Sequence, residues 1–199
     1  MTAMNFDKWR HYLRARRSEI FGKTDDAIRD YRVALQADPG FRKAANALAY
    51  CYAQAGQHAE AIRYFEHAAR LGRPDATVHY NLGYSYEKYR EPRKAIESFR
   101  AAVGLNPSLD RAWYGMGLAH AVLGEHREAM EAFGQAADLQ PMSAPVWYQL
   151  GMASHHAREH KRLRQAITHL NRFDPKAARR LILETGTTDL AHLVKDLAV

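Results

Sequence analysis

The fold is decided by residues 76–109, which read ATVHYNLGYSYEKYREPRKAIESFRAAVGLNPSL. This stretch has small residues at Gly83 and Ala95, an aromatic residue at Phe99 and a closing Pro107. The same kinds of residue return when the sequence is read 34 residues at a time in either direction. A fixed period of this length indicates an array of repeated structural units.

The repeated positions can be followed through most of the chain. The position of Gly83 is held elsewhere by Ala15, Ala49, Gly117 and Gly151. The position of Ala95 is held by Ala27, Ala61 and Ala129, and that of Phe99 by Tyr31, Phe65 and Phe133. Two departures stand out: Leu163 replaces the repeated alanine, and Arg158 replaces a glycine of the turn. A leucine at a close-contact position predicts either a local splay of the helices or a repacked neighbour.

This pattern resembles the tetratricopeptide repeat, a helix–turn–helix unit of the same length. The resemblance implies an all-α fold, a right-handed superhelical solenoid of about five repeats followed by C-terminal capping helices. The repeats are expected at residues 8–41, 42–75, 76–109, 110–143 and 144–177, within a single domain of residues 1–199. The capping helices are expected within residues 178–199, where 176–184 and 188–198 have helical patterns. Each hairpin alone cannot bury its apolar face, so neighbours must stack.

The first repeat is the least regular. Trp9 precedes Ala27 by 18 residues, whereas the family's tryptophan precedes its alanine by 16. Strict register places Arg14 and Ser18 where the third repeat has Leu82 and Tyr86. The first helix is therefore either shifted, with a longer turn, or an end cap with a polar outer face, since terminal repeats are atypical.

The composition of the sequence indicates the cellular compartment of the protein and how its charge is distributed. The sequence contains neither the long apolar run of a membrane span nor the apolar stretch of a secretory signal, so we expect a cytoplasmic protein. The single Cys51 is expected to be a small buried hydrophobe. The formal charge of +7 lies toward the ends: residues 1–43 hold ten Lys and Arg against six Asp and Glu, and residues 158–180 hold eight against two.

The family resemblance also indicates which residues meet a partner. In such repeats, set positions of the first helix face a concave groove. In this chain those positions give the predicted contact residues Lys43, Asn46, Tyr50, Tyr80, Asn81, Tyr84, Lys88, Arg111, Tyr114, Leu118, Tyr148, Gln149 and Met152. Glu87 and His155 occupy such positions too, as Tyr12 and Arg16 do in strict register. Tyrosine offers contact area at low entropic cost and a hydroxyl group, which suits a peptide.

No catalytic, cofactor or metal site is predicted. The glycines follow the repeat period and do not form a phosphate-binding loop, and no nucleophile has a local catalytic signature. His156 and His160 have the spacing of two ligands on one helix, but the turn of the fifth repeat is expected between them. His120 is expected to be a buried, hydrogen-bonded ring.

The sequence therefore favours a non-enzymatic adaptor or scaffold that binds a peptide or helix of a partner protein in its groove. A rival hypothesis is self-association through the ends, motivated by Trp9, Phe6 and the terminal leucines Leu190, Leu193 and Leu197. A third is binding of nucleic acid or another anionic partner by the basic ends, although nucleic acid is the less favoured partner.

Overall fold

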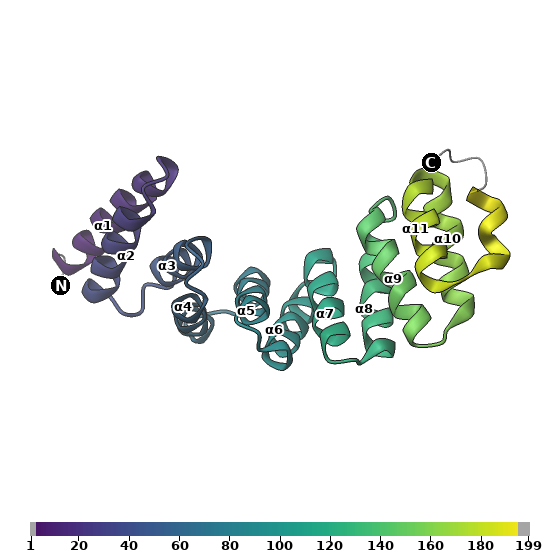
Figure 1. The fold of residues 1–199 in the computed structure, drawn as a ribbon. Coiled ribbons are helices and arrows are strands. Elements are labelled where there is room, and N and C mark those ends of the chain that lie inside the picture. The colour runs from purple at the N-terminus through teal and green to yellow at the C-terminus, as the bar shows by residue number, and fades with distance from the viewer. Residues whose placement is uncertain (1–2, 195–199) are drawn as a thin grey trace. The chain divides into compact units, whose positions relative to one another are not determined.

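The computed structural model describes residues 3–194, and most of them are helical (Figure 1). The chain divides into two compact units, residues 1–106 and residues 107–199. Successive helices pair into hairpins in both units, and no strand occurs among the described residues. The predicted all-α repeat fold is confirmed, whereas a single domain over residues 1–199 stays a prediction.

The first unit holds three hairpins. Their helices are α1 (Ala3–Ile20) and α2 (Thr24–Ala37), α3 (Arg42–Gln54) and α4 (His58–Arg70), and α5 (Ala76–Lys88) and α6 (Pro92–Leu105). Each helix of this unit packs against the next one along the chain. Pro92 begins α6, where a residue without an N–H group is tolerated.

The second unit holds two hairpins and the C-terminal elements. Its helices are α7 (Asp110–Val122), α8 (His126–Leu139), α9 (Ala144–His156), α10 (His160–Phe173) and α11 (Pro175–Thr185), followed by the 3-10 helix η1 (Thr188–Val194). The Asp174 side chain caps α11 by accepting a hydrogen bond of 3.0 Å from the backbone N–H of Ala177. The predicted helix at 188–198 is thus a 3-10 helix as far as Val194, and its remainder, with Leu197, lies outside the described residues.

The turn inside each hairpin has the same backbone geometry in all five repeats. Its residue lies in the left-handed region in every case, at Gly22, Gly56, Arg90, Gly124 and Arg158. The two arginines have φ of 62° and 60°, which costs an L-residue about 1–2 kcal/mol. Because the geometry persists without glycine, the packing of the two helices fixes the turn.

The core of each of the first four hairpins is an alanine and an aromatic ring from the second helix facing a small residue of the first. Tyr31, Phe65, Phe99 and Phe133 are fully buried at the repeat spacing. A Cβ atom added to Gly83 would lie 2.7 Å from Cδ1 of Phe99, which is closer than real Cβ contacts come. The small residue therefore allows the ring to lie directly on the first helix.

In the fifth repeat, different side chains fill the space between the two helices. Leu163 is buried where the other repeats have alanine, and the smaller Ile167 takes the place of the aromatic ring. Leu181 of α11 lies against Gly151, so a side chain of the next helix fills the space above the glycine. Of the two outcomes expected for Leu163, the structure shows the repacked neighbour.

The first helix keeps strict register. Ala15 is fully buried, as Ala49 is at the equivalent position. The rings of Tyr12 and Tyr31 are 5.6 Å apart, the same separation as the equivalent pair in α7 and α8. Helix α1 is therefore not shifted, and its Arg14 is exposed, as expected for an end cap with a polar outer face.

We predict that Gly83→Ala destabilises the protein relative to Gly104→Ala. Both replacements gain the helix propensity of alanine, but only the first places a Cβ against a ring, since nothing lies within 4 Å of a Cβ at Gly104. The difference in the free energy of unfolding should be about 1–3 kcal/mol, measured by urea unfolding. Equal stability of the two variants would show that the close approach is unimportant.

Candidate functional site

The predicted contact residues form two sets, one in each unit. Those of the first unit lie on α3 and α5, and those of the second on α7 and α9. All thirteen are exposed or half-buried, so each retains contact with solvent. We call the set in the first unit, Lys43, Asn46, Tyr50, Tyr80, Asn81, Tyr84 and Lys88, the first-helix face. A role in partner binding stays a prediction for both sets.

The tyrosines separate into two kinds that sequence reasoning did not distinguish. Tyr80 and Tyr114 are half-buried, and their rings lie 6.0 Å and 5.6 Å from Phe99 and Phe133, the buried aromatics of their own hairpins. These tyrosines help to cover the core. Tyr50 and Tyr84 hold the repeat position four residues after that of Tyr80 and Tyr114, and they are 44% and 41% exposed. Their rings are therefore available to a ligand.

The exposed tyrosines lie on neighbouring helices, because α3 contacts α5. The Lys88 ammonium lies 5.0 Å from the centre of the Tyr84 ring and 3.1 Å from a carboxylate oxygen of Glu87. The hydrogen bond to Glu87 raises the pKa of Lys88, so this cation remains charged at neutral pH. The first-helix face thus presents two aromatic rings with a fixed positive charge beside one of them.

Asn46 belongs to the same face but differs from its equivalents. It occupies the position that Tyr12 and Tyr80 hold in the adjacent hairpins. Its side-chain oxygen is buried and has no hydrogen-bond partner among the described residues. Leaving such an atom unpaired costs about 1–3 kcal/mol of stability.

In the second unit, α11 lies beside α9 and contacts its predicted binding residue Tyr148. The hydroxyl of Tyr148 donates a hydrogen bond to Glu184, and the Arg180 guanidinium lies 4.9 Å from the centre of the Tyr148 ring. Burial, followed by the bond to Glu184, raises the pKa of Tyr148 to about 12, so the phenol stays protonated. Sequence reasoning missed Arg180 and Glu184 because it assigned α11 only a capping role. Their i, i+4 spacing was the available signal.

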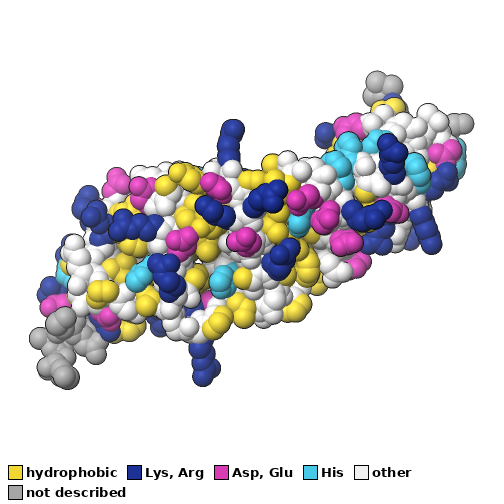
Figure 2. All heavy atoms as spheres, turned by 90° about the horizontal axis from the view of Figure 1, so that it is seen from below, with side chains coloured by type: hydrophobic (Ala, Val, Ile, Leu, Met, Phe, Trp, Pro, Cys, Tyr) yellow, Lys and Arg dark blue, Asp and Glu magenta, His cyan; other side chains and the backbone are white. Residues whose placement is uncertain are grey.

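Histidines gather in the second unit, toward the C-terminal helices in the view of Figure 2. The rings of His126 and His156 stack with their centres 4.8 Å apart, and His155 meets His156 edge-on at 5.3 Å. His156 ends α9 and His160 begins α10, so the turn does separate them. No three His, Cys, Asp or Glu side chains of the described residues are arranged as metal ligands. His120 is buried and lies 2.6 Å from a carboxylate oxygen of Glu125.

Comparison with known proteins gives the following likenesses. Two family models, each described as tetratricopeptide repeat, match residues 21–82 and 80–144. The crystal structure of MamA protein is 23% identical to this chain, with a TM-score of 0.77 over 97% of both chains. That of YrrB, described as a TPR protein with an unusual peptide-binding site, is 22% identical, with a TM-score of 0.77 over 89% of this chain and 90% of that one. MamA 41-end from Desulfovibrio magneticus RS-1 is 19% identical, with a TM-score of 0.75 over 94% and 98%.

No curated protein sequence matches the chain. At identities below one quarter, these solved structures establish a shared fold and leave the ligand open. Within the described part of the chain, no helix is both long and apolar enough to cross a bilayer.

We predict that His156 contributes a loss of stability as the pH falls below about 6.5. Burial, then the neighbouring His126 and His155, lowers the pKa of His156 from its ordinary value of 6.5. The unfolded chain therefore takes up this proton more readily, and unfolding becomes easier in acid. Thermal unfolding of His156→Gln should show a smaller loss between about pH 7.5 and about pH 5.5, by less than about 1 kcal/mol because solvent screens the ring. Equal losses in both proteins would contradict this assignment.

We also predict that Cys51 is unreactive in the folded protein. Burial raises the pKa of this thiol to about 11, so at pH 8 only about one molecule in a thousand carries the thiolate. Labelling with a thiol-specific reagent should be about a hundredfold slower in buffer than in concentrated urea. Rapid labelling of the folded chain would show that α3 opens readily.

Proposed function

Because the chain belongs to the tetratricopeptide repeat family, we propose that it is a non-enzymatic scaffold whose first-helix face binds a peptide or helix of a partner protein. The observation that carries the proposal is the pair of exposed rings of Tyr50 and Tyr84 on adjacent helices. Aromatic side chains with one polar end dominate the energetics of many protein interfaces.

The chemistry of the face suits an extended or helical segment. The rings supply apolar area, Lys88 supplies a positive charge, and Asn81 and Asn46 supply amide groups for a backbone. Lys43, whose ammonium lies 5.6 Å from the centre of the Trp9 ring, supplies a second cation. We infer a peptide that combines apolar side chains with at least one carboxylate, bound with an affinity of about 1 μM, or roughly −8 kcal/mol.

The peptide-binding site described for YrrB supports this reading by analogy, since the two chains share a fold over most of their lengths. The second unit is the weaker candidate for primary contact. Its Tyr148 is already engaged by Arg180 and Glu184, and its Tyr114 packs on Phe133. We therefore place the energetic centre of binding in the first unit.

The proposal predicts that Tyr50→Ala with Tyr84→Ala weakens binding of a peptide selected from a random display library by at least about tenfold. Loss of even one buried aromatic anchor costs about 2 kcal/mol or more at an interface. Isothermal titration would measure the affinity, and circular dichroism would verify the fold.

Tyr89→Ala is the matched control. Tyr89 is 53% exposed, is the C-cap residue of α5 and is not among the residues of the first-helix face. Its replacement should leave the affinity unchanged. If the double variant bound the selected peptide as tightly as the unaltered protein, the first-helix face would not be the binding site.

A further inference from the structure

The outward surface of α1 combines apolar and basic residues in a regular order. Phe6, Leu13 and Ile20 recur at seven-residue intervals and are 70%, 62% and 75% exposed. Arg10 and Arg17 recur between them and are exposed as well. On a helix, residues at this spacing lie along one side. We call this set of five residues the α1 outer face.

The positions of α3 and α5 that match the arginines of α1 are buried by a helix, whereas those that match Leu13 and Ile20 retain contact with solvent. Ala44, Leu48 and Cys51 on α3, and Val78, Leu82 and Ser85 on α5, are all buried. The preceding second helices, α2 and α4, pack against α3 and α5. In strict register, α1 has Arg10, Arg14 and Arg17 at these three positions. An apolar helix could not be seated there without stripping water from three guanidinium groups.

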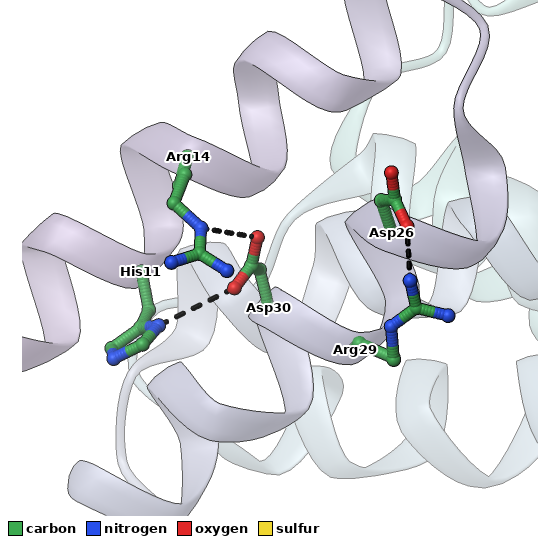
Figure 3. Close-up of polar contacts among 5 residues, drawn as sticks. All are labelled: His11, Arg14, Asp26, Arg29 and Asp30. Carbon is green, nitrogen blue, oxygen red and sulfur yellow. Dashed lines mark hydrogen bonds and ion pairs between the residues drawn. The ribbon is translucent and has the colours of Figure 1, made fainter.

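A pocket of about 430 Å³ adjoins this surface, between the end of α1 and the beginning of α2. Two ion pairs lie beside each other there (Figure 3): Arg14 bonds to Asp30 at 2.9 Å, and Arg29 bonds to Asp26. His11 also meets Asp30, at 3.4 Å. Both carboxylates that line the pocket, Asp26 and Asp30, are therefore already paired with cations.

The remaining cations of the pocket are Arg17 and Lys23. Among residues 6–193, neither has a carboxylate within ion-pair distance. The pocket therefore carries surplus positive charge beside an exposed apolar stripe.

We propose that the α1 outer face is a second docking surface, which binds an acidic amphipathic helix of a partner protein. The partner helix would lie along α1. Its apolar side would cover Leu13 and Ile20, and its carboxylates would meet Arg10 and Arg17. In the repeat register Leu13 and Ile20 hold the positions of Asn81 and Lys88, so this surface continues the line of the first-helix face onto α1. Tyr50 and Tyr84 lie on α3 and α5, so replacing them distinguishes the two proposals.

Other ligands fit the α1 outer face less well than an acidic helix does. Two copies of α1 placed face to face would bring their arginines together, which disfavours self-association through this surface. The apolar stripe is one residue wide, which fits the seam of a helix pair better than a bilayer surface.

The test uses the full chain and a fluorescein-labelled synthetic helical peptide with leucine at every seventh position and glutamates on either side. Fluorescence anisotropy should show saturable binding that weakens as salt is added. Arg10→Glu with Arg17→Glu should reduce the affinity by about tenfold or more, because two ion pairs become two like-charge contacts. Leu13→Ser should reduce it about fivefold without changing the salt dependence.

Lys161→Glu with Arg172→Glu is the control, since it makes the same change of net charge at exposed positions of α10. An unchanged affinity in the control, with loss in the α1 variants, supports the proposal. Equal loss in both double variants, or no binding to the unaltered chain, overturns it. Tighter binding of a DNA duplex or of phosphatidylserine vesicles than of the peptide would also overturn it, in favour of those ligands. Tyr50→Ala with Tyr84→Ala should leave this binding intact.

Discussion

The close approach of a small residue on one helix to a large ring on the next is the constraint on which the hairpins depend. At Gly83 there is no space for even one added carbon, because the Phe99 ring fills it. A ring held this close fixes the separation and the crossing of the two helices. The fixed separation of the helices then sets the geometry of the turn. This explains why Arg90 and Arg158 accept a left-handed backbone conformation, which favours glycine. The fifth hairpin keeps the constraint by a different route, with Leu181 above Gly151.

The same constraint determines what remains for binding. Side chains that complete the core, such as Tyr80 against Phe99, cannot leave it without a loss of stability. Residues one helical turn further on, such as Tyr84, do not complete the core and remain exposed. On α1, arginines hold three positions that are buried on α3 and α5, so this helix presents a chemistry of its own.

The fold was predictable from the sequence because its determinants recur. Phe99 and its equivalents, repeated at a fixed period, give both the helical hairpins and their boundaries. The candidate site was predictable only in part. Periodicity placed Tyr50, Tyr80 and Tyr84 on one kind of surface, but exposure depends on neighbours in space, which a period does not encode. Arg180 and Glu184 were missed for the same reason, since α11 follows the last regular repeat and its contacts with Tyr148 have no counterpart earlier in the chain.

The spacing of the helices has a consequence for how such a chain can be modified. Helices α3, α5, α7 and α9 begin at residues 42, 76, 110 and 144, and the second helices keep the same interval. Excising residues 42–75, or copying them and splicing them in again, would therefore leave every downstream residue at its own position in the repeat. The length of the array and the chemistry of its face can thus be changed independently. Adding or removing whole repeats changes the length, and single substitutions within a repeat change the chemistry of the face.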